Sequence, residues 1–172
     1  SKSHLQTFTF QKKFNYNLIK NGLKNLIVLG TCYEYGKVEG AISENHNCNP
    51  HIPYSLAKLK LLKSILDLKK KYIFKFTWLR PFFVYGLNDK RKTLYSLIKE
   101  IDEGKDIKLN VCGSLVRDFL SIEYLIKVIF KISKLNQDIG ILNVCSGKKI
   151  TIKNFIISNL KNKEKIKRIN MN

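Results

Sequence analysis

Short apolar runs alternate along this chain with segments in which apolar residues have helical spacing. The run at 25–31 (NLIVLGT) is partly β-branched and closes on a glycine, which is typical of a buried strand in a parallel sheet. Residues 15–23, just before it, are expected to be helical. Three further strands are predicted at 73–79, 107–112 and 141–144.

The predicted helices lie between these strands. One begins at Pro53, ends near residue 70 and places five apolar residues on one face: Leu56, Leu59, Leu62, Ile65 and Leu66. Two more are expected at 94–103 and 121–134, and Thr151 is expected to cap the last helix. Strands alternating with helices predict an α/β fold with a largely parallel sheet, whose ligands gather at the carboxyl ends of the strands.

The segment 32–53 is polar and rich in turn-forming residues, which predicts a long loop. Loops of that length in compact domains often have a function. Because this loop follows Thr31 at the end of a predicted strand, it is expected at the ligand-binding edge of the sheet. A weakly marked boundary between two parts of the chain is expected near Gly86.

The composition raises the question of whether the positive charge indicates a nucleic-acid partner. The 172 residues are 44% hydrophobic, enough for one core or a core with a small lobe, and the formal net charge is +19. A basic chain can bind nucleic acid, but these lysines are scattered, and the only dense run is at 161–168. We therefore favour a solvated surface over a nucleic-acid partner, and a small phosphate-bearing ligand would also suit the charge.

The chain has no apolar run of 18 residues and no signal-peptide pattern at its first residues, so we expect a cytoplasmic protein without a membrane partner. Its cysteines show no C-x-x-C pairing and are expected to be reduced: Cys32, Cys48, Cys112 and Cys145. The three histidines lack metal-ligand spacing, so no metal site is predicted.

Tyr54 and Lys58 are four residues apart and are expected to share one face of the helix that begins at Pro53. A nearby ammonium stabilises a phenolate and lowers the tyrosine pKa from about 10 toward a value useful for acid-base catalysis. The same spacing also occurs at three other pairs: Tyr16/Lys20, Tyr33/Lys37 and Tyr95/Lys99. The spacing alone is therefore weak, and the surrounding sequence has to distinguish Tyr54.

That context is a strand ending in Gly30 and Thr31, then the segment 32–36 (CYEYG), and then Tyr54, which lies 23 residues after Thr31. Three later motifs follow in order: LRPFFVYG at 79–86, RDFL at 117–120 and NVCSG at 143–147. Together they resemble the extended short-chain dehydrogenase/reductase family, in particular its NAD-dependent epimerases and dehydratases that act on nucleotide sugars.

The resemblance implies a role for each matching residue. Tyr54 is the proton donor or acceptor, Lys58 binds the nicotinamide ribose, and Thr31 hydrogen-bonds the reacting oxygen of the substrate. The position matching Pro81 lines the nicotinamide of NAD or NADP. Arg117 matches an arginine that meets the phosphates of the nucleotide sugar, where a guanidinium can bind two oxygens at once.

The resemblance also implies a domain organisation. Residues 1–86 are expected to be the C-terminal part of a Rossmann-like domain with the catalytic residues. Residues 87–172 are expected to form mostly a small α/β nucleotide-sugar-binding lobe with interleaved Rossmann elements. The family's Gly-x-x-Gly-x-x-Gly loop, which cradles pyrophosphate, is not in this sequence. We therefore expect a fragment truncated at its N-terminus, a degenerate copy or half of an assembly.

The reaction type is suggested by the residues after Thr31. Sugar 4,6-dehydratases of this family have an Asp-Glu pair there, whereas this chain has Cys32 and Tyr33. The motif at 30–36 (GTCYEYG) instead resembles that of enzymes that reduce or epimerise a nucleotide-linked sugar at C4, as in the synthesis of surface polysaccharide. The alternative function is that of an inactive module that binds a nucleotide sugar or docks on a homologue. Either form of the protein could also be a homodimer.

Overall fold

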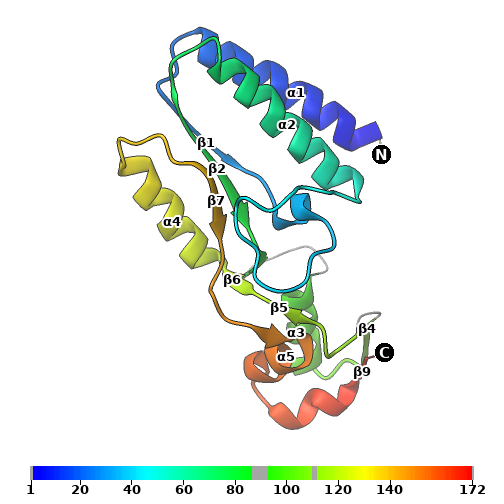
Figure 1. Ribbon diagram of the computed structural model, residues 1–172. Coiled ribbons are helices and arrows are strands. Elements are labelled where there is room, and N and C mark those ends of the chain that lie inside the picture. Colours follow the sequence, from blue (N-terminus) through cyan, green and yellow to red (C-terminus); the bar gives the residue numbers. More distant parts are fainter. Residues whose placement is uncertain (1, 87–92, 110–111, 172) are drawn as a thin grey trace. The chain divides into compact units, whose positions relative to one another are not determined.

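The computed structural model describes residues 2–86, 93–109 and 112–171 (Figure 1). The chain forms two compact units. Unit 1 comprises Ser1–Phe82 and Lys127–Val144, and unit 2 comprises Phe83–Ile126 and Cys145–Asn172. Each unit is therefore built from two separate stretches of sequence.

Unit 1 contains a parallel sheet of three strands in the order β1-β2-β7: β1 (Asn25–Leu29), β2 (Lys75–Pro81) and β7 (Gly140–Val144). Leu26 is in register with Phe76, and Trp78 with Ile141. The predicted α/β class with a parallel sheet is confirmed. All three strands end at the same edge because they run in the same direction.

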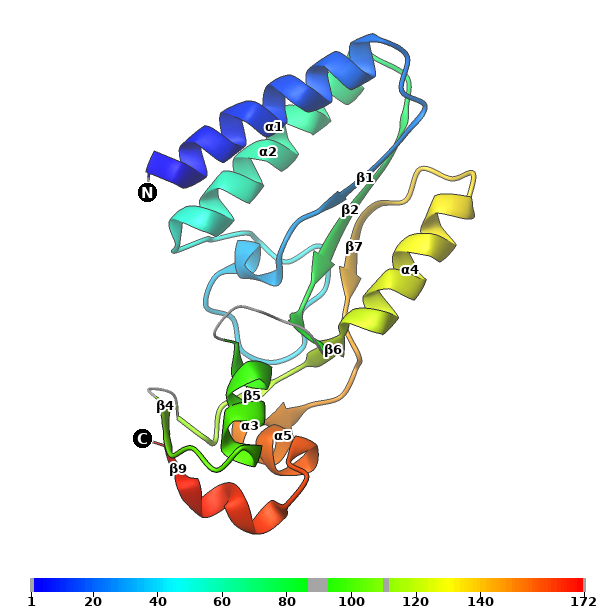
Figure 2. The ribbon, with the colours of Figure 1, turned by 180° about the vertical axis from the view of Figure 1, so that it is seen from behind.

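Helices cover both faces of this sheet. Figures 1 and 2 show α1 (Lys2–Lys20) and α2 (Pro53–Lys69) side by side on one face, with the unit 1 part of α4 (Ile122–Lys134) on the other. The core beneath α1 and α2 contains eight buried residues: Ile19, Leu26, Leu61, Leu62, Ile65, Phe74, Phe76 and Trp78. The predicted helix that begins at Pro53 is confirmed, and so is that at 121–134 to within one residue.

Three differences from the expected elements have simple causes. The first helix begins at Lys2 rather than at residue 15, and its exposed Leu5, Phe10 and Phe14 obscure the apolar face that packs on α2. A short 3-10 helix, η1 (Cys32–Tyr35), lies in the predicted loop. β2 begins at Lys75 rather than residue 73, because Ile73 is fully exposed in the turn before it.

Unit 2 has a second core between two short helices, α3 (Leu94–Asp102) and α5 (Ile152–Asn159). Thr151 caps α5 as predicted, because its hydroxyl accepts the backbone N–H of Asn154 at 3.1 Å. The expected strand at 107–112 is shorter, and residues 110 and 111 lie outside the described residues.

Three two-stranded sheets and a 3-10 helix complete unit 2. They comprise β3 (Phe83–Tyr85) with β6 (Phe119–Ser121), β4 (Ile107–Leu109) with β9 (Ile169–Met171), β5 (Val116–Arg117) with β8 (Ile150–Thr151), and η2 (Lys163–Arg168). Most of these strands were not predicted, since two or three residues show no measurable period. Among the described residues, no helix is long and apolar enough to cross a membrane.

Replacing Ile65 tests the core of unit 1. Ile65 is fully buried on α2, so Ile65→Ala should lower the free energy of unfolding by about 2–5 kcal/mol through lost burial and the cavity it leaves. Ile73→Ala removes the same atoms at a fully exposed position and should change it by less than about 0.5 kcal/mol. Urea titration followed by circular dichroism measures both, and equal losses would contradict this core.

Candidate active site

The carboxyl end of β1 passes directly into a capped turn. Thr31 is the N-cap of η1, and its hydroxyl accepts the backbone N–H of Tyr33 at 3.3 Å. In return, the backbone N–H of Thr31 donates to the Glu34 carboxylate at 2.9 Å, which completes a capping box. Thr31 is thus buried and held in a fixed conformation at the edge where the parallel strands end.

Glu34 is a fully buried carboxylate with three kinds of donor around it. Besides the Thr31 amide, it accepts the indole N–H of Trp78, whose Nε1 lies 3.1 Å from both oxygens. Arg80 Nε donates to Glu34 Oε2 at 2.8 Å, and both side chains are nearly inaccessible to solvent. The glycine at position 30 follows from this packing, because a Cβ there would overlap Trp78 and Glu34.

The Arg80 guanidinium links this ion pair to the long loop after η1. It lies over the Tyr35 ring, 4.5 Å from the centroid, and its Nη2 donates to Cys48 Sγ at 3.1 Å. The Tyr35 hydroxyl donates to Asn143 of β7 at 2.7 Å, and burial raises the pKa of Tyr35 above its ordinary value. The loop is therefore fixed to both β2 and β7.

Tyr54 and Lys58 lie on α2, which contacts η1. Lys58 Nζ donates to the carbonyl oxygen of Leu29, the last residue of β1, at 2.9 Å and lies 5.9 Å from the Tyr54 ring centroid. Burial lowers the pKa of the Lys58 ammonium, and the Glu34 charge opposes that effect. The structure thus brings Lys58 beside both Tyr54 and the β1 end that leads into Thr31.

Two residues near this site, Glu34 and His4, were not predicted from the sequence. Glu34 could have been found, because Thr31-x-x-Glu34 has the spacing of a capping box directly after a strand. His4 carries no such signal: its ring lies 5.8 Å from the Tyr54 ring because α1 runs beside α2. Pro81 is the last residue of β2 and is paired in register with Val144.

Arg117 belongs to unit 2, where it is the last residue of β5. It pairs with Ile150 across β5 and β8, and its guanidinium lies 5.1 Å from the Phe83 ring centroid. The neighbouring Asp118 accepts the backbone N–H groups of two residues, Ser146 and Gly147, at 2.7 Å each. Among the described residues, no ion pair joins Arg117 to Asp118.

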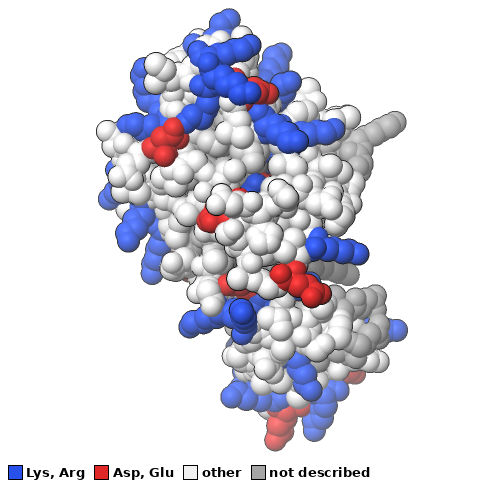
Figure 3. Space-filling view, in the orientation of Figure 1, with Lys and Arg blue, Asp and Glu red and all other residues white. Residues whose placement is uncertain are grey.

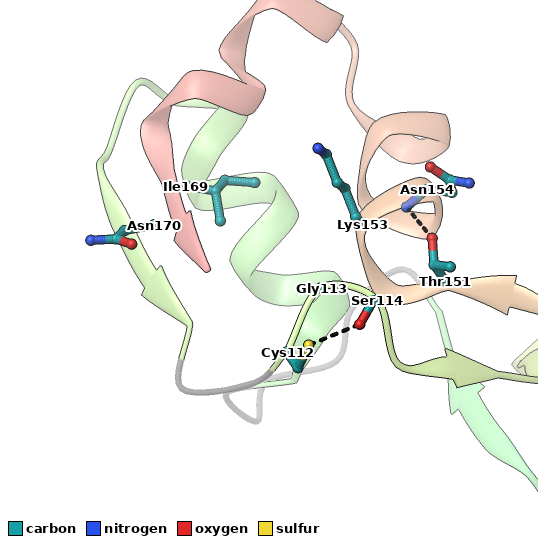
Figure 4. A pocket seen from close by; sticks show the side chains of 8 residues that line it. All are labelled: Cys112, Gly113, Ser114, Thr151, Lys153, Asn154, Ile169 and Asn170. Atoms are coloured by element: carbon teal, nitrogen blue, oxygen red, sulfur yellow. Dashed lines mark hydrogen bonds between the residues drawn. The ribbon is translucent and has the colours of Figure 1, made fainter. Parts of the chain in front are cut away.

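Unit 2 also has a hollow of about 630 Å³ that contains none of the predicted site residues (Figure 4). It is lined by Cys112, Gly113, Ser114, Thr151, Lys153, Asn154, Ile169 and Asn170. The thiol of Cys112 lies 2.9 Å from the Ser114 hydroxyl, and hydrogen bonding from Ser114 lowers its pKa. No group of three or more His, Cys, Asp or Glu residues that could hold a metal ion occurs in the described part of the chain.

A parallel sheet covered by helices, with polar groups at the carboxyl ends of its strands, places the chain in the Rossmann-like α/β class. The family follows from the sequence match: the model of the NAD dependent epimerase/dehydratase family matches residues 15–145. The chain belongs to this family, and the recognition made from the ordered motifs is confirmed.

Individual relatives agree with this assignment. The chain is 30% identical over 149 residues to dTDP-6-deoxy-L-talose 4-dehydrogenase (NAD(+)) of Aggregatibacter actinomycetemcomitans, a match that covers 85% of this chain and 54% of that protein. The chain therefore spans about half the length of the curated relative it matches.

Solved structures share the fold at lower identity. UDP-glucuronic acid 4-epimerase from Bacillus cereus, in complex with UDP-glucuronic acid and NAD, has a TM-score of 0.80 at 22% identity, covering 88% of this chain and 50% of that one. TunA, an NAD-dependent NDP-hexosamine 5,6-dehydratase, has a TM-score of 0.85 at 18% identity, covering 99% of this chain and 57% of that one.

Removing the charge of Glu34 tests whether its buried ion pair with Arg80 stabilises the fold. Glu34→Gln leaves the Arg80 guanidinium buried without a counter-charge and should lower the free energy of unfolding by about 3–5 kcal/mol. Glu39→Gln makes the same change at an exposed position of the same loop and should have almost no effect. Thermal unfolding of both variants decides the matter, and a Glu34→Gln variant as stable as Glu39→Gln would refute the role given to the pair.

Proposed function

We propose that this chain carries the catalytic and substrate-binding residues of an NAD(P)-dependent nucleotide-sugar 4-epimerase or 4-ketoreductase. The observation that carries the proposal is the position of Lys58, whose ammonium contacts the end of β1 and lies beside the Tyr54 ring. Thr31 follows that strand end by two residues and is fixed by η1. These are the three groups that hydride transfer at a sugar carbon needs near one oxygen.

Each group has a separate task in the proposed reaction. The hydroxyls of Thr31 and Tyr54 orient the C4 oxygen of the sugar, and the proton enters or leaves through Tyr54 Oη. The positive charge of Lys58 stabilises the Tyr54 phenolate, which lowers the tyrosine pKa toward neutrality. Glu34 supports this charge, because its carboxylate opposes the effect of burial on the Lys58 pKa.

The cofactor of this proposal is NAD or NADP, which supplies hydride transfer when it is bound. The residues fit this role: Lys58 has an ammonium that can also donate to ribose hydroxyls, and Pro81 ends β2 at the edge where the nicotinamide would lie. Tyr54 is more than one-third exposed, as expected of a residue that would meet a substrate and a cofactor.

The substrate of the proposal is a nucleoside diphosphate sugar whose phosphates meet Arg117. The proteins that this chain resembles include a 4-dehydrogenase of a dTDP-sugar and a 4-epimerase of a UDP-sugar, and both are named for position C4. Cys32 and Tyr33 follow Thr31 where a sugar 4,6-dehydratase would have acidic groups, which favours reduction or epimerisation over dehydration. Surface polysaccharide synthesis in the cytoplasm is the proposed setting.

The proposal includes a homodimer through α1 and α2. Both helices expose large apolar side chains, among them Leu5, Phe10, Phe14, Leu56 and Leu66. Such side chains are more favourably buried against a second copy than left in water. Light scattering of the purified protein tests this part of the proposal, and a monomer at micromolar concentration would overturn it.

A second candidate is an inactive module that binds a nucleotide sugar or docks on a homologue. Calorimetric titration with NADH, NADPH and a panel of UDP-, CDP-, GDP- and dTDP-sugars distinguishes the candidates. Sugar-nucleotide binding without dinucleotide binding would favour the module, whereas binding of both would favour the enzyme.

Tyr54→Phe tests the proposed chemistry directly. Removal of the hydroxyl should lower kcat for NAD(P)H-dependent reduction of a 4-keto sugar nucleotide by about 10²–10⁴, because the proton donor is lost. Tyr16→Phe is the matched control, since Tyr16 also precedes a lysine by four residues. It should keep the full rate. Unchanged turnover in a folded Tyr54→Phe enzyme would exclude the proposed role of Tyr54.

A further inference from the structure

The Asp118 carboxylate is held by backbone amides rather than by a cation. Its Oδ1 accepts the N–H of Ser146 at 2.7 Å, and its Oδ2 accepts the N–H of Gly147 at the same distance. Distances of this length are typical of charge-assisted hydrogen bonds. Gly147 has a φ of 76°, which a side chain would disfavour, so the turn after β7 is shaped to present two amides to one carboxylate.

In this arrangement Asp118 forms no ion pair with Arg117. Neighbouring Arg and Asp residues could form an ion pair, which would occupy the same guanidinium N–H groups that a phosphate uses. Here Arg117 Nη1 donates to the carbonyl oxygen of Val116 at 2.8 Å, and the guanidinium lies over the Phe83 ring. Among the described residues, Arg117 has no carboxylate within ion-pair distance.

The same aspartate fixes the backbone around Arg117. The Asp118 carbonyl oxygen accepts the N–H of Phe83 at 3.2 Å, so the ring beneath the guanidinium is tied to the residue next to Arg117. On the preceding side, Arg117 is paired with Ile150 of β8, and β8 follows the turn that the carboxylate holds. The turn is therefore linked to both supports of Arg117: to Phe83 through Asp118, and to Ile150 through β8.

We propose that Asp118 is a positioning residue for the recognition of a nucleoside diphosphate. By binding the Ser146 and Gly147 amides, it holds Arg117 in place and keeps its guanidinium free of a competing carboxylate. This inference rests on the proposed function, in which Arg117 meets the phosphates of the substrate. It adds that the affinity for phosphate depends on a residue that does not touch the ligand.

Calorimetric titration of Asp118→Asn with dTDP, UDP, GDP and CDP tests the proposal, each compared with its own nucleoside. Asparagine can accept only one of the two amides, so the turn should loosen and the affinity for the best-bound diphosphate should fall by about tenfold. Affinity for the nucleoside should change by less than about twofold. Electrostatics alone predicts the opposite sign, because removing a negative charge favours an anion.

Two controls separate positioning from a general structural effect. Asp67→Asn makes the same change in an exposed ion pair with Lys70 and should leave diphosphate affinity unchanged. In an Arg117→Ala background, Asp118→Asn should have no further effect on diphosphate affinity. Unchanged or increased diphosphate affinity in Asp118→Asn, or an equal loss for nucleoside and diphosphate, would overturn the proposal for Asp118 alone. If the unmodified protein binds none of the diphosphates, the proposed function fails first, and this inference with it.

Discussion

The buried ion pair between Glu34 and Arg80 is the interaction on which the candidate active site depends. A carboxylate and a guanidinium removed from water are costly unless each is met by the other and by further hydrogen bonds. Glu34 has these partners in Trp78 and in the Thr31 amide, and Arg80 lies against the Tyr35 ring. Because the partners come from η1, its N-cap Thr31 and β2, the pair fixes the geometry where η1 meets β2.

The proposed catalytic and binding residues are supported in the same way in the two units. In unit 1, the Glu34 carboxylate accepts a backbone amide of Thr31 and orders the turn after β1. In unit 2, the Asp118 carboxylate accepts two amides and orders the turn after β7. In each case an acidic group shapes backbone beside a proposed functional residue, Thr31 or Arg117, and is not itself proposed to touch the substrate.

The sequence allowed the family, the parallel α/β fold and the longer helices to be predicted, because long apolar repeats and ordered motifs are local signals. It did not reveal the partners of Glu34, since Trp78 and Arg80 lie more than 40 residues away along the chain and meet it only through strand pairing. The short strands of unit 2 escaped prediction for a similar reason: pairing with a distant segment, not local periodicity, makes them strands. The roles of Tyr54, Lys58, Pro81 and Arg117 stay predictions.

Hydrogen exchange of the Thr31 amide, resolved by NMR, tests most directly whether the buried carboxylate orders this site. That amide donates to Glu34 rather than to a neighbouring strand, so its protection reports on the carboxylate itself. If the carboxylate holds this amide, its exchange should be as slow as that of the β1 amides paired with β2. Exchange at the rate of an unprotected loop amide would contradict it, because Thr31 would then not be held where the proposed chemistry needs it.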